Sequence, residues 1–73
     1  MIRNYRLIDL DCANCAAKME REIGKIEGVK KVIINFMTTK MTIEADEEKF
    51  EKIEKDAQEI VKKFESEVTM KRI

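Results

Sequence analysis

The sequence lacks histidine, proline and tryptophan, and it has only two cysteines and two glycines among 73 residues. Without histidine the chain has neither the most common general acid–base residue nor the most common zinc ligand. Without proline it has no cis-proline turn. The two cysteines are therefore the first candidates for a functional site.

An excess of charge of one sign is also absent, because 15 lysines and arginines balance 15 aspartates and glutamates. Such a chain lacks the long-range field that draws proteins to nucleic acids or anionic lipids, so we expect no nucleic-acid partner and no direct membrane insertion. No apolar run approaches the roughly 20 residues that a membrane-spanning helix needs, and residues 1–6 do not resemble a signal peptide. We expect one soluble domain over residues 1–73 with a thin core.

The two cysteines, Cys12 and Cys15, are separated by only two residues. A disulfide between them would close a very small ring, which is a poor staple for a secreted fold. Secreted scaffolds of this size usually carry about four or more cysteines. We therefore expect a reducing, cytosolic compartment in which both thiols are free.

Four stretches predict β-strands because apolar and polar residues alternate in them: residues 3–10, 29–36, 41–43 and 68–70. A short polar turn at residues 37–40 separates the second stretch from the third. These two stretches therefore predict a β-hairpin.

Two other stretches repeat apolar residues at spacings of three and four, which predicts amphipathic helices. Asp11 or Asn14 is the candidate N-cap of the first helix, and Gly28 falls just past its expected end. Asp46 is the candidate N-cap of the second helix, which we expect to end at residues 65–67.

The resulting order is βαββαβ. A four-stranded antiparallel sheet covered on one face by two helices buries every apolar stripe in this order, so the sequence predicts an α+β, ferredoxin-like fold. This topology brings three connections to one end of the sheet, at residues 9–15, 37–40 and 64–67. We expect the functional site at that end.

The segment Cys12-Ala13-Asn14-Cys15 lies where the first strand passes into the first helix. The N–H groups at a helix start stabilise a thiolate, so at least one of the two sulfurs should ionise more readily than a free cysteine. Two such thiols bind a metal ion or alternate between dithiol and disulfide. A thioredoxin-type oxidoreductase needs a longer chain and usually a cis-proline, and a structural zinc site needs four protein ligands. We therefore favour an open two-thiolate site that carries an ion, with a small dithiol redox protein as an alternative.

Residues 10–20, LDCANCAAKME, resemble the metal loop of the heavy-metal-associated domain. Gly28-Val29 and the Val32-x-Ile34-Asn35 stretch extend the resemblance over nearly the whole chain. The family includes copper chaperones, mercury-binding proteins and N-terminal domains of soft-metal P-type ATPases. The resemblance implies a metal-binding domain that is not an enzyme by itself.

The residue before the first cysteine separates the branches of this family. Copper-carrying members typically read Gly-Met-Thr/Ser-Cys-x-x-Cys, whereas residues 9–15 here read DLDCANC, similar to zinc-, cadmium- and lead-exporting ATPases. Zn(II) and Cd(II) want about four donors and accept a carboxylate beside sulfur, while two thiolates suit Cu(I). Asp11 is therefore the candidate third donor, or else only a helix cap. Glu65 or Glu67 is the candidate fourth donor.

The resemblance thus implies a cytosolic domain that is tethered to a membrane transporter, as a piece of a metal-exporting P-type ATPase. We expect it to bind Zn(II) or Cd(II), and Pb(II) as a further candidate, through Asp11, Cys12 and Cys15. The sequence has no Gly-rich phosphate loop, so we do not expect ATP hydrolysis by this chain. Its expected partners are the metal ion and the rest of the ATPase, and so open a site would also allow a metal-bridged dimer. Cu(I) binding, in a chaperone or a copper ATPase, is the alternative.

Overall fold

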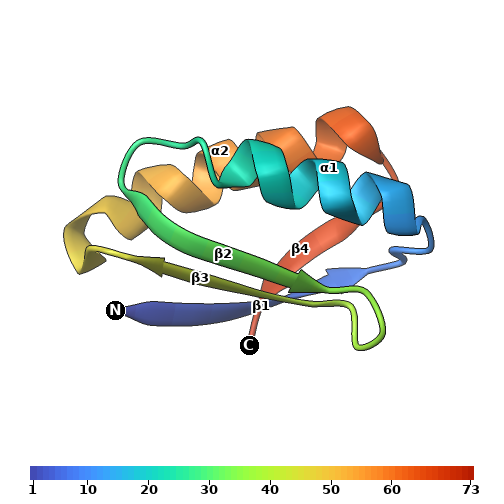
Figure 1. The fold of residues 1–73 in the computed structure, drawn as a ribbon, viewed down its shortest axis with the longest axis horizontal. Helices are drawn as coiled ribbons and strands as arrows, with labels where there is room; N and C mark the ends of the chain where they lie inside the picture. The colour runs from blue at the N-terminus through green and yellow to red at the C-terminus, as the bar shows by residue number, and fades with distance from the viewer.

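The chain alternates strands and helices, as the computed structural model of residues 1–73 shows (Figure 1). The elements are β1 (Ile2–Ile8), α1 (Ala13–Ile23), β2 (Val29–Asn35), β3 (Lys40–Ala45), the short 3-10 helix η1 (Glu47–Lys49), α2 (Phe50–Phe64) and β4 (Thr69–Arg72). The strands form one antiparallel sheet in the order β2-β3-β1-β4. Both helices lie on the same face of this sheet, so the predicted α+β, ferredoxin-like fold is confirmed.

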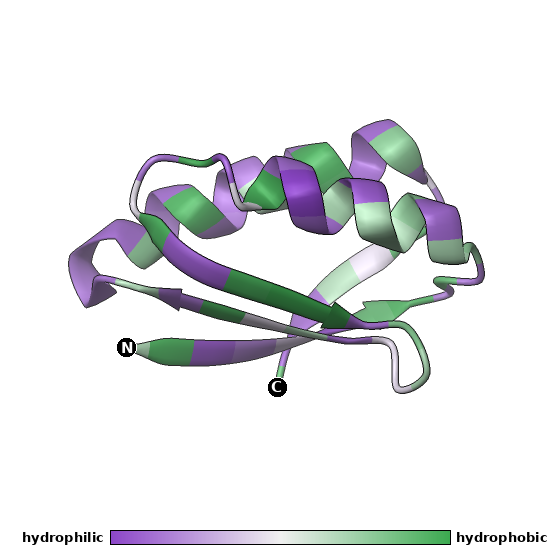
Figure 2. Ribbon diagram, viewed as in Figure 1, coloured by the Kyte–Doolittle hydropathy of each residue, from purple (hydrophilic) through white to green (hydrophobic).

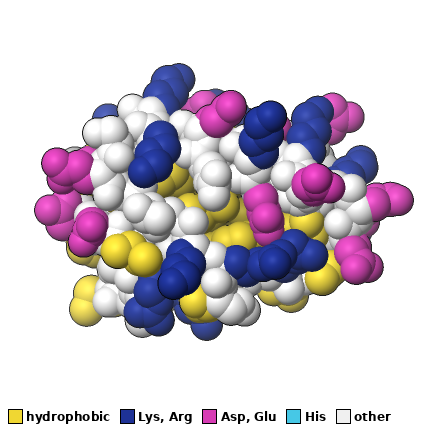
Figure 3. All heavy atoms as spheres, turned by 180° about the vertical axis from the view of Figure 1, so that it is seen from behind, with side chains coloured by type: hydrophobic (Ala, Val, Ile, Leu, Met, Phe, Trp, Pro, Cys, Tyr) yellow, Lys and Arg dark blue, Asp and Glu magenta, His cyan; other side chains and the backbone are white.

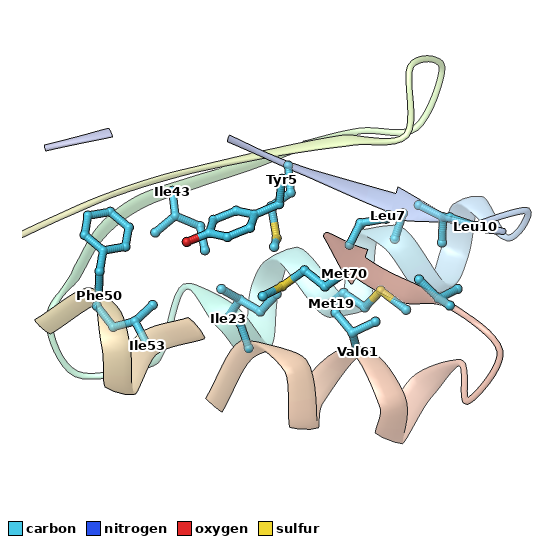
Figure 4. Packing of buried hydrophobic residues seen from close by; sticks show 14 of the residues in the cluster. Tyr5, Leu7, Leu10, Met19, Ile23, Ile43, Phe50, Ile53, Val61 and Met70 are labelled. Carbon is cyan, nitrogen blue, oxygen red and sulfur yellow. The ribbon is translucent and has the colours of Figure 1, made fainter. Parts of the chain in front are cut away.

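The core lies between the sheet and the two helices and consists of 15 buried residues, all of them apolar. Each helix contributes residues spaced three or four apart, such as Met19 and Ile23 from α1 and Phe50 and Ile53 from α2 (Figure 4). Figure 2 shows the corresponding alternation of hydrophilic and hydrophobic residues around both helices. The apolar stripes that predicted the helices are the surfaces that meet the sheet.

The boundaries of α1 differ from the prediction at both ends. Its N-cap is Cys12, whose sulfur accepts a hydrogen bond from the Cys15 N–H at 3.2 Å, so neither Asp11 nor Asn14 caps the helix. The helix ends at Ile23 and not near Gly28, because the backbone leaves the helix after Gly24. Gly28 instead has φ of +99° in the turn before β2, a conformation that favours glycine.

The N-cap prediction at Asp46 is also wrong in its chemistry. Asp46 precedes η1 but makes no side-chain capping hydrogen bond, and α2 itself begins at Phe50. The Asp46 carboxylate pairs instead with Lys30 of β2, at 3.3 Å. The Asp46 carboxylate therefore binds a lysine ammonium and not the backbone N–H group that the prediction assigned to it.

Three connections meet at one end of the sheet, as the topology predicted (Figure 1). The Leu7 N–H donates to the Thr39 carbonyl oxygen at 2.8 Å, which joins the end of β1 to the hairpin. The thiol of Cys15 lies against Glu65, which follows α2. The residues singled out from the sequence therefore belong to one end of the molecule. Neither helix of the structure has the length and apolar character needed to cross a membrane.

Candidate metal centre

The thiol loop is fixed by the way β1 ends. The strand stops at Ile8, and Asp9 takes a positive φ of 70° that turns the chain towards the helices. Leu10 then enters the core, where it is only 6% exposed. The buried Leu10 anchors the loop from beneath, so the following residues, Asp11 and Cys12, begin at a defined position above the sheet end.

Cys12 and Cys15 are both free thiols and both half-buried. Cys12 is the N-cap residue, with φ of −121° and ψ of 109°, and Cys15 lies in the first turn of α1. The Cys15 N–H that donates to the Cys12 sulfur at 3.2 Å is one of the orphan donors of the helix start. One contact therefore caps the helix and orients the first sulfur towards the second.

Glu65 reaches this pair from the opposite end of the chain. The Cys15 thiol donates to the Glu65 Oε1 at 3.4 Å. One ligand atom from each of Cys12, Cys15 and Glu65 lies within 4.8 Å of the other two. These three residues therefore form a compact set of two sulfurs and one carboxylate.

Backbone hydrogen bonds on both sides hold Glu65 in place. Its N–H donates to the Val61 carbonyl oxygen at 2.9 Å, and its own carbonyl oxygen accepts from the Val68 N–H at 3.1 Å. The Lys62 ammonium donates to the Ser66 carbonyl oxygen at 3.3 Å, which closes the turn after α2. The carboxylate therefore approaches the thiols from a braced turn between α2 and β4.

The other two predicted donors lie outside this set. Asp11 and Glu67 are exposed, and neither carboxylate belongs to the cluster of Cys12, Cys15 and Glu65. Asp11 precedes the N-cap by one residue and does not cap the helix. Of the two glutamates proposed from the sequence, Glu65 is the one that the structure brings to the sulfurs, and ligation by Asp11 stays a prediction.

The surroundings of Cys15 oppose its ionisation. Interaction with the Cys12 sulfur, then burial, then the hydrogen bond and negative charge of Glu65 raise the pKa of Cys15 from 9.0 to about 12. Cys15 is therefore not a sulfur that ionises more readily than a free cysteine. Its proton is held beside two acceptors, the Cys12 sulfur and the Glu65 carboxylate, and a cation placed there would displace that proton and bind the same groups.

This arrangement can bind a metal ion of intermediate softness. Thiolates are soft donors and a carboxylate oxygen is a hard one, and zinc accepts both kinds. Glu65 forms no ion pair in the structure, so no lysine or arginine competes for its charge. The half-buried position leaves one side of the cluster open for a further donor.

Sequence reasoning missed the capping role of Cys12. Capping preferences favour Ser, Thr, Asp and Asn, which directed attention to Asp11 and Asn14. The spacing nevertheless allowed this role, because an N-cap side chain accepts from the N–H group two or three residues later and Cys12 precedes Cys15 by three residues. A sulfur at that position offers the same kind of acceptor as a serine hydroxyl.

Comparison with known proteins shows that the chain is similar to metal-handling proteins. The model of the family described as "Heavy-metal-associated domain" matches residues 4–67. The probable cadmium-transporting ATPase of Listeria monocytogenes is 51% identical over 39 residues, which is 53% of this chain and 6% of that protein. The cadmium, zinc and cobalt-transporting ATPase of Helicobacter pylori is 38% identical over 52 residues, which is 71% of this chain and 7% of that protein.

Solved structures show the same similarity. The N-terminal domain of a potential copper-translocating P-type ATPase from Bacillus subtilis, in its Cu(I)-loaded state, has a TM-score of 0.75 and 27% sequence identity. The alignment covers 97% of this chain and 84% of that one. The chain thus matches most of that domain, whereas the matched residues span only 6% and 7% of the two transporting ATPases.

Proposed function

Because the chain belongs to the heavy-metal-associated domain family, which includes metal-binding domains of P-type ATPases, we propose that it binds Zn(II) or Cd(II). Pb(II), a larger soft ion, is a further candidate for the same site. The observation that carries the proposal is the convergence of Cys12, Cys15 and Glu65, whose ligand atoms lie within 4.8 Å of one another. The names of the two transporting relatives, which include cadmium and zinc, support the same choice.

The donor set favours a divalent ion over Cu(I). Two thiolates alone satisfy the low coordination number of Cu(I), so a copper site gains little from a carboxylate. Zn(II) and Cd(II) need about four donors, and the extra negative charge of Glu65 attracts a divalent ion more strongly than a monovalent one. Glu65 therefore supplies the selectivity that the cysteine pair lacks.

We assign the ligand roles as follows. Cys12 and Cys15 bind as thiolates, and Glu65 provides the third donor atom. Asp11 provides the fourth, because its exposed carboxylate adjoins Cys12 and is not engaged in any ion pair or hydrogen bond of the structure. Because these residues are half-buried or exposed, the metal can leave as well as bind, which suits a domain that hands its ion on.

The domain would serve a larger transporter. The chain spans about a fifteenth of the transporting relatives, whose names assign metal transport to the whole protein. We propose that it regulates or supplies such a pump from the cytosolic side, as one non-catalytic domain over residues 1–73, while ATP hydrolysis belongs to the rest of the protein. Its partners would then be the ion and the remaining domains of that ATPase.

The test is a set of competitive titrations of the reduced protein with Zn(II), Cd(II) and Cu(I). Glu65→Gln should weaken Zn(II) binding by about tenfold or more, roughly 1.4 kcal/mol, and leave Cu(I) binding almost unchanged. Asp11→Asn should act in the same direction if it completes the shell. Glu67→Gln is the matched control, because it removes the same charge from the same turn without reaching the sulfurs.

Cu(I) binding is the competing function, and the Cu(I)-loaded Bacillus subtilis domain is the observation that favours it. If Glu65→Gln and Asp11→Asn both leave Zn(II) affinity unchanged, the carboxylates are not ligands. The site is then a two-sulfur copper site, and the divalent proposal fails.

A further inference from the structure

The balanced net charge conceals an uneven distribution of charge over the surface, in which both ends of the sheet are acidic: the end opposite the thiols carries exposed acidic residues at 46–48. The acidic residues Asp9, Asp11, Glu65 and Glu67 lie at the end that carries the thiols. The face of the sheet opposite the helices, here called the open face, shows the reverse pattern. It carries four basic side chains and a single acidic one, in β1, β2, β3 and β4: Arg6, Lys31, Lys40, Lys71 and Glu44.

Three of these cations form a row across the open face. Arg6 of β1 is directly opposite Lys40 of β3 on one side and Lys71 of β4 on the other. Directly opposite residues on one face have Cβ atoms about 5 Å apart, and like charges there are destabilising. All three side chains are exposed, and none forms an ion pair within the chain. The row therefore lacks an internal counter-charge, and a negative surface outside the chain would relieve its repulsion.

Exposed aliphatic side chains surround the row. Ile8 is 38% exposed beside it, and Ile33 and Ile2 are 47% and 57% exposed farther along the same face. Cations interspersed with exposed aliphatic residues suit the boundary between anionic headgroups and acyl chains. A fluid layer also supplies negative charge at any lateral spacing, whereas an acidic protein would need carboxylates placed in register with the row.

We propose that the open face of the sheet docks on an anionic lipid bilayer. The basic side chains of the open face are attracted to such a surface and the acidic side chains beside the thiols are not, so the open face, and not the thiol loop, makes the contact. Figure 3 shows basic side chains along the sheet side, at the bottom of the view, and acidic ones at both the left edge, on the side of the thiol loop, and the right edge.

The row also lies close to that loop. Arg6 is two residues from the end of β1, and Lys40 is the first residue after the hairpin at the same end. Docking therefore holds the thiol loop beside the membrane surface with its sulfurs free in solution. A few cations give only weak binding alone, but the contact becomes effective when the chain is tethered to the same membrane.

Vesicle co-sedimentation of the metal-free, reduced chain tests this proposal. At low ionic strength the chain should sediment with phosphatidylglycerol vesicles and stay in solution with phosphatidylcholine vesicles, and salt should abolish the binding. The variant Arg6→Gln/Lys40→Gln/Lys71→Gln should lose binding by about tenfold or more. The matched control is Lys18→Gln/Lys52→Gln/Lys55→Gln, which removes three exposed cations from the helices.

Equal loss in the two triple variants would show that binding follows net charge, and it would overturn the proposal. If the wild-type chain does not bind phosphatidylglycerol vesicles, the proposal is also overturned. An acidic protein would then be the partner that fits the row of cations. Zn(II) affinity is measured in parallel and should be unchanged in both triple variants. Because the vesicle assay uses no metal, failure of this proposal is distinguishable from failure of the metal site.

A single-tryptophan reporter checks the orientation, because the chain has no tryptophan of its own. Ile33→Trp, on the open face, should shift its emission to shorter wavelength when phosphatidylglycerol vesicles are added. Gln58→Trp, on the exposed side of α2, should not. A shift at position 58 without one at position 33 would place the helices on the lipid and contradict the proposal.

Discussion

The thiol of Cys15 donates to a carboxylate oxygen of Glu65 at 3.4 Å across 50 residues of sequence. The contact joins the first turn of α1 to the turn between α2 and β4. An ion bound at this point would therefore cross-link two segments that are otherwise connected only through the core. Metal binding and fold stability should accordingly be coupled.

Zn(II) should raise the thermal stability of the reduced chain. At about 100 times the dissociation constant, binding adds about 2.7 kcal/mol, which corresponds to a rise in Tm on the order of 10–20 °C for a domain of this size. Circular dichroism with and without Zn(II) measures the shift. Glu65→Gln should reduce it and Cys12→Ser/Cys15→Ser should abolish it, whereas an undiminished shift in Glu65→Gln would show that the carboxylate does not bind the ion.

Zn(II) affinity should rise with pH because binding displaces the proton of Cys15. The pKa of this thiol is raised to about 12, so it is protonated throughout the neutral range, and each unit of falling pH should weaken binding by about tenfold for that proton. Titrations between about pH 6 and pH 8 measure this slope. A pH-independent affinity would mean that Cys15 does not lose its proton to the metal.

Glu65→Gln should also change the titration of Cys15 in the metal-free chain. The hydrogen bond and negative charge of Glu65 are among the causes that raise this pKa, so removing the charge should lower it. The ultraviolet absorbance of the thiolate, followed against pH, reports the change. Glu67→Gln, which does not contact the thiol, should leave the titration of Cys15 where it is.

Element order and the position of the site were predictable from the sequence, because both follow from local periodicity and topology. Alternation located the strands, and the βαββαβ order brought the thiol loop and the turn after α2 to one end. The end of α1 was not predictable in this way. Ile26 continues the apolar spacing and packs against the core, yet it does so from a turn beyond Ile23 and Gly24.

The choice between the two glutamates also required the structure. Glu67 is exposed and lies outside the set of Cys12, Cys15 and Glu65, as does Asp11, whose ligation stays a prediction. Glu65 reaches the sulfurs because Val61 and Val68 hold its backbone on both sides. Such a long-range orientation depends on packing that no local pattern encodes.

A hydrogen-bonded network away from the thiols should make stability depend on pH. The Tyr5 hydroxyl donates to Glu54 at 2.6 Å, and Arg3 donates to the same oxygen at 3.0 Å. Burial alone would raise the pKa of Glu54, but the hydrogen bonds from Tyr5 and Arg3 and the charges of Arg72 and Arg3 lower it below 4.5. A lowered pKa contributes stability that is present above the unfolded value and lost as pH falls through the folded value.

Tyr5→Phe should therefore cost about 1–3 kcal/mol at neutral pH, because it removes a hydrogen bond to a charged acceptor. The difference from the wild type should shrink below pH 4.5, as Glu54 becomes protonated. Urea unfolding at neutral and acidic pH measures both values. A difference that stays constant with pH would assign the effect to packing of the ring and not to the carboxylate.

Cys12 has two roles that a pair of substitutions can separate. Its sulfur caps α1 through the Cys15 N–H, and the proposed function makes the same sulfur a metal ligand. Cys12→Ala removes both acceptor and ligand, so it should lower the free energy of unfolding by about 1 kcal/mol and abolish tight Zn(II) binding. Cys12→Ser keeps a capping oxygen but replaces the soft donor, so it should restore stability without restoring Zn(II) affinity. Urea unfolding and Zn(II) titration of both variants measure the two quantities, and recovery of Zn(II) binding in Cys12→Ser would show that the thiolate is not needed.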